Sequence, residues 1–128
     1  MNILLDTCSF LWIIAGSDEL SGASRELFME PENDVFLSAA SCWEIGVKWS
    51  LGKLTLPEEP GRFIAGQRVR HLIESLPITE EATFHLPKLP PHHKDPFDRI
   101  LVCQAIEHAL TILTPDPLIS QYPVRTIW

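Results

Sequence analysis

The sequence lacks a hydrophobic run long enough to cross a membrane. Its longest apolar stretch, residues 10–15, falls far short of the roughly 20 residues that a bilayer span needs. The start of the chain also lacks the basic segment and long apolar stretch of a secretory signal, because Asp6 interrupts the apolar residues early. We therefore expect a protein without a membrane segment that works in the cytoplasm.

Cysteine is scarce and follows no disulfide or zinc pattern. The three cysteines are far apart in the sequence and form no Cys-x-x-Cys pair. This arrangement argues against a disulfide framework and against a zinc knuckle. We expect Cys8, Cys42 and Cys103 to be small side chains buried in the core, because each lies in or beside an apolar stretch.

Positive charge is also in short supply. Lys and Arg total 10 against 17 Asp and Glu, which gives a formal net charge of −7. Proteins that bind nucleic acid usually contact phosphates through Lys and Arg, so this balance argues mildly against such a role. A nucleic-acid function would need a local source of positive charge, such as a bound cation.

The remaining composition is that of one compact unit. A chain of 128 residues with 45% hydrophobic residues can bury a single core. Internal repeats and low-complexity segments are absent. We therefore expect a single domain over residues 1–128.

Short apolar runs alternate along the chain with segments of helical spacing. The expected strands are Asn2–Leu5, Asp34–Ser38, residues 110–114 and an edge strand in residues 124–128. The expected helices are residues 24–29, 39–51, 61–73, 79–86 and 97–109, and residues 76–78 form a short piece between two of them. This alternation predicts an α/β fold in which helices flank a central parallel sheet.

Two acidic residues follow expected strands directly. Asp6 closes the first strand, and Asp116 follows the strand at residues 110–114 with only Pro115 between. Each residue alone is also typical of a turn. Because the carboxyl ends of parallel strands meet at one edge of a sheet, we expect both side chains to lie in the same crevice.

Two further acids can reach the same edge from helices. Glu44 lies one turn into the largely apolar helix that begins where the second strand ends, and a buried carboxylate there needs a partner. Asp98 lies at the start of the helix at residues 97–109, where a carboxylate also interacts favourably with the helix dipole. Asp95 is a good N-cap for that helix, with Pro96 at its first position.

Crowded carboxylates require either raised pKa values or a cation. Ligands that offer only oxygen favour a hard divalent ion, Mg²⁺ or Mn²⁺, which keeps coordination positions for water and phosphate oxygens. Such an ion can lower the pKa of a bound water and neutralise charge on a phosphoryl group. The acidic residues therefore indicate hydrolysis of a phosphodiester bond.

Several short motifs follow one another along the chain. They are LLDT at residues 4–7, SAASCWEI at 38–45, LGKL at 51–54, LPI at 76–78, His92 with DPFDR at 95–99, and LTPD at 113–116. Together they resemble one family, the VapC-type PIN-domain toxins. Each motif alone is weak, but they occur in the family's order over nearly the whole chain.

The resemblance implies a PIN fold with an acidic quartet that binds Mg²⁺ or Mn²⁺ and cuts RNA. The quartet falls on Asp6, Glu44, Asp98 and Asp116. The resemblance further implies homodimers, a structured RNA substrate such as tRNA or ribosomal RNA, and inhibition by a VapB-like antitoxin.

Other positions match the family less directly. Thr7 and Thr114 match hydroxyl positions that orient an acid or a water, and Asp95 matches an acid of uncertain role. Arg99 either contacts substrate phosphate or pairs with an acid. Cys8 departs from the Asn or His that many relatives carry, which puts in doubt a side-chain hydrogen bond from that position.

Basic residues in two groups offer a possible RNA-facing rim, although a solvated helix face is the commoner explanation. They are Arg62, Arg68, Arg70 and His71 in the middle helix, and Lys48, Lys53, Lys88, Lys94 and Arg99 near the acids in sequence.

Three classes of alternative remain open from the sequence, the first of which is another metal enzyme. A DNA nuclease would use the same acids, whereas a dehalogenase-like phosphatase would need an acid at the position of Cys8. A non-catalytic PIN-like binding module is a second class. A zinc site from His92, His93 and Asp95 is a weaker alternative, because adjacent histidines chelate poorly.

Overall fold

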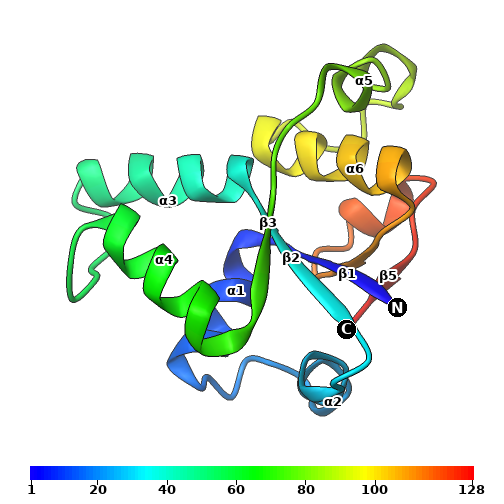
Figure 1. Cartoon of the computed structure of the whole chain (residues 1–128). Helices are drawn as coiled ribbons and strands as arrows, with labels where there is room; N and C mark the ends of the chain where they lie inside the picture. The colour runs from blue at the N-terminus through cyan, green and yellow to red at the C-terminus, as the bar shows by residue number, and fades with distance from the viewer.

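The computed structural model describes residues 1–128. A parallel sheet of short strands forms the centre of the protein (Figure 1). The strand order is β3-β2-β1-β4-β5, and all four neighbouring pairs are parallel. The strands are β1 Asn2–Leu5, β2 Asp34–Ser38, β3 Ile73–Leu76, β4 Thr111–Leu113 and β5 Thr126–Ile127. The expected α/β class with a central parallel sheet is therefore confirmed.

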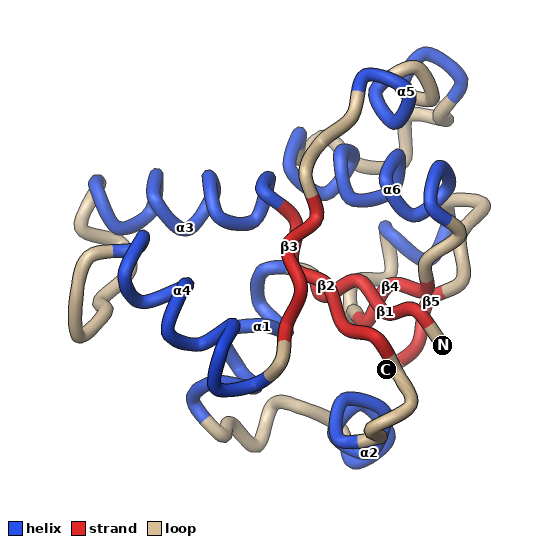
Figure 2. The backbone as a smooth tube through the Cα atoms, in the orientation of Figure 1, coloured by secondary structure: helices blue, strands red, loops and turns tan.

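Helices cover both faces of this sheet (Figure 2). They are α1 Thr7–Ala15, α2 Gly22–Met29, α3 Ala39–Ser50, α4 Pro60–His71, α5 Glu80–Thr83 and α6 Pro96–His108, with 3₁₀ turns η1 Leu86–Lys88 and η2 Ile119–Gln121. In Figure 1, α6 lies along one side of the sheet, whereas α1, α2 and α4 lie along the other. None of the helices combines the length and apolar character that a bilayer-spanning helix requires.

The strands are apolar on both sides because each face packs against helices. Ile3 and Leu5 of β1 belong to the core cluster that includes α1 and α4, whereas Leu4 between them belongs to the cluster around α6. All three side chains are at most 1% exposed. Alternate residues of a strand point to opposite faces, so an uninterrupted apolar run is what a sheet covered on both sides requires.

A buried polar side chain joins α6 to the end of β2. Gln104 is fully buried and accepts a 2.6 Å hydrogen bond from the Ser38 hydroxyl, while its amide donates to the Pro77 carbonyl at 3.2 Å. The Ser38 hydroxyl also accepts from the Ala40 backbone N–H and so caps α3. These bonds fix α3 and α6 relative to the carboxyl edge of the sheet.

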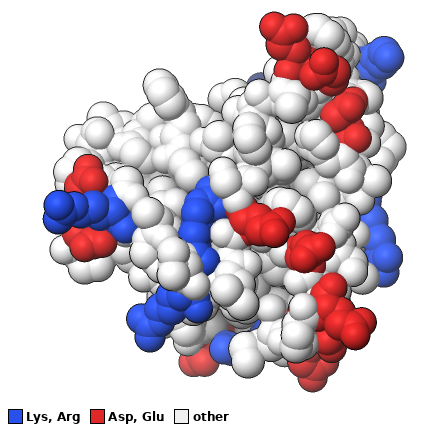
Figure 3. Space-filling model, viewed as in Figure 1, with Lys and Arg blue, Asp and Glu red and all other residues white.

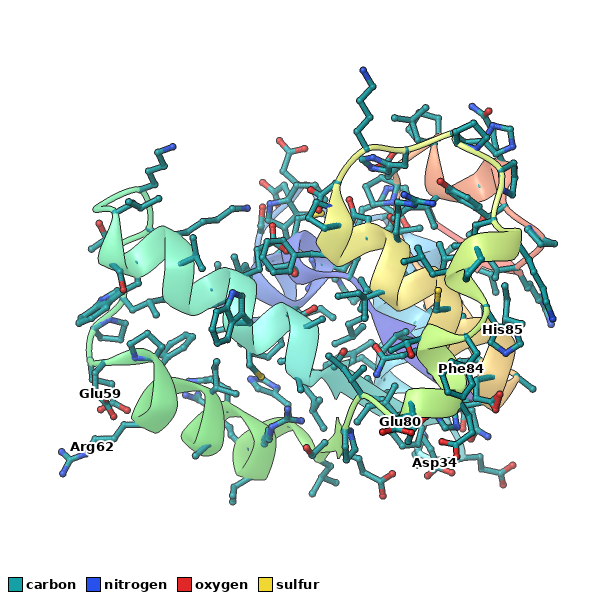
Figure 4. All side chains as sticks on the ribbon, turned by 90° about the horizontal axis from the view of Figure 1, so that it is seen from above. Asp34, Glu59, Arg62, Glu80, Phe84 and His85 are labelled. Atoms are coloured by element: carbon teal, nitrogen blue, oxygen red, sulfur yellow. The ribbon has the colours of Figure 1, made fainter.

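The short helix α5 lies against α6, as Figure 4 shows from above. The labelled His85 follows α5, and its Nε2 lies 3.1 Å from the Glu107 carboxylate of α6. At the other side of the molecule, the labelled Glu59 caps α4 by accepting from the Arg62 backbone N–H. Both contacts are remote from the start of α6.

The structure corrects two expected helices in the middle of the chain. The helix expected at 61–73 ends at His71, because Leu72 takes a left-handed conformation with φ 56° and Ile73 begins strand β3. The helix expected at 79–86 is limited to Glu80–Thr83, because Pro87 cannot continue it and forms part of a 3₁₀ turn instead.

Helix α1 was not expected from the sequence. The Asp6 carboxylate accepts a 2.8 Å hydrogen bond from the Ser9 backbone N–H at its start, and Gly16 ends it with φ 62°. Both residues are ordinary helix-end signals. Most of its residues are buried or half-buried, so its apolar side chains do not follow one face and the sequence does not indicate a helix there.

The expected burial of all three cysteines is correct only for Cys103. All three are free thiols, but Cys8 and Cys42 are half-buried. Cys8 lies at the carboxyl edge of the sheet among polar groups rather than in the core.

Replacement of the buried amide tests the link between α3 and α6. We expect Gln104→Leu to lower the free energy of unfolding by about 1–3 kcal/mol, because the Ser38 hydroxyl and Pro77 carbonyl lose their partner while buried. Urea denaturation measures this change. The matched control, Gln121→Leu at an exposed position, should stay within about 0.5 kcal/mol of the wild type. Equal stabilities of the two variants would contradict the role of Gln104.

Candidate active site

A cavity of about 240 Å³ opens at the carboxyl edge of the sheet. It is lined by Asp6, Thr7, Cys8, Leu11, Glu44, Lys48, Asp95, Asp98 and Asp116. The four acids of the expected quartet thus lie together, although they come from the end of β1, from α3, from the start of α6 and from the loop after β4. The carboxyl ends of β1 and its neighbours place them there, as the crevice rule for parallel sheets requires.

Asp6 is held by donors on both carboxylate oxygens. Its Oδ1 accepts from the Ser9 backbone N–H at 2.8 Å, and its Oδ2 accepts from the Thr114 hydroxyl. The Ser9 hydroxyl in turn donates to the Leu113 carbonyl at 2.9 Å. These bonds join the ends of β1 and β4, and they orient a carboxylate that is only 4% exposed.

Glu44 reaches the cavity from one turn inside α3. Its Oε1 accepts a 2.6 Å hydrogen bond from the Thr7 hydroxyl, and its Oε2 lies 2.9 Å from the Lys48 ammonium. The hydrogen bond with Glu44 raises the pKa of Lys48, although partial burial acts in the opposite direction. Glu44 therefore has the partners that a buried carboxylate needs, and Lys48 is the one basic side chain that lines the cavity.

Asp95 and Asp98 reach the cavity at the start of α6. The Asp95 carboxylate accepts from the backbone N–H groups of Phe97 and Asp98, so it caps the helix as expected and also lines the cavity. Burial, followed by the negative charge of Asp95, raises the pKa of Asp98 from 3.8 to about 7, while His93 acts in the opposite direction.

Asp116 follows β4 and is joined to Asp98 through a histidine that the sequence did not single out for this role. The Nε2 atom of His93 forms a 3.0 Å hydrogen bond with Oδ2 of Asp116 and also lies 3.0 Å from Oδ2 of Asp98. Oδ1 of Asp116 accepts from the Leu118 backbone N–H at 2.8 Å.

The zinc site considered from the sequence does not form. The His92 ring packs against the Tyr122 ring with centroids 5.2 Å apart, and it is not part of the group that could hold a metal ion. The group whose spacing would suit a metal is instead His93, Asp98 and Asp116, whose potential ligand atoms lie within 4.8 Å of one another. His92 and His93 are adjacent in the sequence but contact different side chains.

The hydrogen bonds leave one quartet oxygen without a protein partner. Oxygens of Asp6, Glu44 and Asp116 accept the bonds described above, and Oδ2 of Asp98 contacts His93, whereas Oδ1 of Asp98 has none. The cavity holds five carboxylates and one ammonium. This excess of negative charge and the oxygen donors suit a hard divalent cation.

Arg99 does not line the cavity and forms no ion pair. Its Nε atom is buried without a hydrogen-bond partner. The interpretation in which Arg99 pairs with an acid is therefore wrong.

The basic residues of α4 do not line the cavity. Arg68 donates to the backbone carbonyls of Glu74 and Leu37 and so supports the β3 edge of the sheet. On the face in Figure 3, basic side chains gather toward α4, while acidic side chains gather toward α2 and α5. No residue of the α4 group lines the cavity, and of the second group only Lys48 does.

Cys8 donates a long hydrogen bond to the acid that begins α1. Its Sγ lies 3.4 Å from Oδ1 of Asp6. Burial and the negative charge of Asp6 raise the pKa of the Cys8 thiol to about 12. The side-chain hydrogen bond that was in doubt at this position is therefore present, and the thiol stays protonated.

The parallel sheet and its edge of carboxylates are those of the PIN-domain class. The family model of the PIN domain matches residues 3–124, and the chain belongs to this family. Ribonuclease VapC16 of Mycobacterium tuberculosis is 32% identical over 62 residues, which cover 48% of this chain and 44% of that protein. The matched part is thus less than half of either protein.

Solved structures share the fold over almost the whole chain. VapBC2 from Rickettsia felis, bound to a DNA fragment from its promoter, has a TM-score of 0.74 at 16% identity, covering 99% of this chain and 98% of that chain. FitAcB from Neisseria gonorrhoeae has a TM-score of 0.66 at 18% identity, covering 98% and 96%. At these identities the likeness establishes the fold.

The raised pKa of Asp98 predicts a pH-dependent loss of stability in the metal-free protein. Asp98 ionises near 3.8 when unfolded and near 7 when folded, so native stability falls as the pH rises through this interval. Asp98→Asn removes the loss. We expect the variant to be more stable than the wild type at pH 8 by on the order of 1 kcal/mol, a value reduced for solvent screening, and the difference to shrink toward pH 5.

Thermal denaturation in the presence of a chelator measures this difference. Asp18→Asn, at an exposed position outside the cavity, is the matched control and should show no such dependence on pH. A pH-independent difference between Asp98→Asn and the wild type would contradict the assignment.

The raised pKa of Cys8 predicts a thiol that resists alkylation. At pH 8 we expect iodoacetamide to modify Cys8 at least about 100-fold more slowly in the folded protein than in urea, because the thiolate is the reactive form. Peptide mass spectrometry follows the reaction at each cysteine. Equal rates at Cys8 in both states would be inconsistent with the thiol–carboxylate contact.

Proposed function

We propose that the protein is a VapC-type endoribonuclease that depends on Mg²⁺ or Mn²⁺. The observation that carries this proposal is the cavity at the carboxyl edge of a PIN-family sheet, into which four separate segments bring Asp6, Glu44, Asp98 and Asp116. The name of the VapC16 relative supports ribonuclease activity. The substrate that we propose is a structured RNA such as tRNA or ribosomal RNA.

The residues present fit a hard divalent cation. The quartet offers only carboxylate oxygens, and the unpartnered Oδ1 of Asp98 gives such an ion a point of entry. Burial, followed by the negative charge of Asp95, raises the pKa of Asp98, and a bound cation would favour its ionised form. When bound, the ion would supply an activated water and neutralise charge on the phosphate.

The chain's own residues have separate tasks in this proposal. Thr7 and Thr114 hold the carboxylates of Glu44 and Asp6 through hydroxyl hydrogen bonds, so that both remain aimed into the cavity. Lys48 is 47% exposed at its side chain, and it is placed to meet a phosphate oxygen at the cavity mouth. The acidic net charge then matters less than this local arrangement.

Loss of single carboxylates tests the proposed chemistry. We expect Asp6→Asn and Asp98→Asn each to reduce RNA cleavage by at least about 100-fold, because each removes a charged ligand from the ion. Cleavage of a folded RNA pool with Mg²⁺, with and without a chelator, measures the effect, and mapped RNA ends identify the bond. The exposed Asp18→Asn is the matched control and should retain full activity.

The same assay separates the rival functions. Circular dichroism establishes that each variant is folded. Growth arrest that persists in both quartet variants although RNA cleavage is lost would favour a non-catalytic binding module, and a preference for matched DNA over RNA would favour a DNA nuclease.

We also propose a VapB-like antitoxin as the protein partner. The names of solved neighbours that contain VapBC complexes support this pairing. Exposed apolar side chains on α3 and at its C-cap support a protein partner in general, because Trp43 is 70% exposed and Leu51 64% exposed. Co-expression with a short neighbouring reading frame should give a stable complex without RNA cleavage. Full cleavage activity in the purified complex would contradict an inhibitory partner.

A homodimer is part of the same proposal. Light scattering of the purified chain should give about twice the 14.5 kDa mass of one chain. A mass of one chain at all concentrations tested would contradict it.

A further inference from the structure

His93 occupies a fixed position between two acids of the cavity. Its backbone N–H donates a 2.9 Å hydrogen bond to the Tyr122 hydroxyl, and its side chain is only 14% exposed. Its Nε2 atom lies 3.0 Å from one oxygen of Asp98 and 3.0 Å from one oxygen of Asp116. The ring is thus held at the backbone and at its outer nitrogen.

The contact of the other ring nitrogen, Nδ1, determines which of the two nitrogens carries the ring hydrogen. The Asp95 backbone N–H donates to Nδ1 of His93 at 3.2 Å. A nitrogen that accepts a hydrogen bond must present its lone pair and cannot carry a hydrogen, so the ring hydrogen is on Nε2. Nε2 is then a donor, and the carboxylates of Asp98 and Asp116 are its acceptors.

The spacing of these atoms alone would also suit a metal ligand, because the group lies within 4.8 Å. Coordination through Nε2 would require its lone pair and would move the ring hydrogen to Nδ1. That hydrogen would face the Asp95 N–H, which already points at Nδ1. The backbone at the start of α6 therefore opposes coordination by His93 and favours its role as a donor.

We propose that His93 is a positioning residue that holds the Asp98 and Asp116 carboxylates together through its Nε2 hydrogen and is not itself a metal ligand. This inference rests on the proposed metal-dependent function. Its consequence is a ligand set that contains oxygen alone, with Oδ1 of Asp98 left free for the ion. Donors that orient ligating carboxylates commonly contribute 10- to 100-fold to metal affinity.

The position of the ring hydrogen is open to direct measurement. Imidazole ¹⁵N NMR should place the hydrogen of His93 on Nε2 in both metal-free and Mg²⁺-loaded protein. The signal is assigned among the five histidines by its loss in His93→Gln. In the Mn²⁺-loaded protein, electron spin echo spectra should contain no ¹⁴N coupling from a directly bound imidazole. A ¹⁴N coupling present in the wild type and absent in His93→Gln would overturn the proposal.

Two substitutions of His93 distinguish a hydrogen-bond donor from a side chain that only fills space. His93→Gln keeps an N–H donor near the place of Nε2, whereas His93→Leu keeps bulk without a donor. We expect Mn²⁺ affinity, measured by electron paramagnetic resonance titration, to fall 10- to 100-fold in His93→Leu and to stay within about threefold in His93→Gln. The control His92→Leu alters the same loop but no contact with the acids, and should bind Mn²⁺ like the wild type. Unchanged affinity in His93→Leu would overturn the proposal.

These readouts do not depend on RNA. If the wild type binds Mn²⁺ with the expected His93 signature but cuts no RNA, the proposed function fails while the role of His93 stands. If it cuts RNA and His93 proves to be a ligand, the proposed function stands and this inference fails.

Discussion

The carboxylates at one edge of the sheet repel one another. The other side chains of the cavity are arranged so that they reduce this repulsion. Asp6 and Glu44 are each met by a hydroxyl, from Thr114 and Thr7 respectively, and Glu44 also by the Lys48 ammonium. Asp98 has the least support, and burial followed by the negative charge of Asp95 raises its pKa to about 7. The protein alone therefore compensates the cluster incompletely, which is the condition under which a divalent ion binds.

The parallel sheet creates this crowding and also makes it tolerable. Because β1 and β4 are parallel neighbours in the sheet, the residues that follow the two strands lie side by side. The same proximity lets Thr114 donate to Asp6 across 108 positions of sequence and lets Ser9 donate to the Leu113 carbonyl. Asp6 and the Thr114 hydroxyl that holds it thus come from neighbouring strand ends.

The helices contribute rigid placement rather than net positive charge. Gln104 joins α6 to the start of α3 through Ser38, and Glu44 and Asp98 line the cavity from these two helices. Asp95 caps α6 while its own backbone N–H holds the His93 ring. A site for a small ion with strict geometry benefits from ligands on elements that are fixed in this way.

The sequence by itself determined the α/β class and the placement of the strands β1, β2 and β4, because strands covered on both faces must be short uninterrupted apolar runs. It also indicated which acids follow those strands. Only the tertiary structure decided that Leu72 would end α4 and let Ile73 begin β3, and that His93 would join Asp98 to Asp116. The physical reason is that local patterns record backbone preference and burial, whereas the partner of a polar side chain depends on contacts between residues that are distant in sequence.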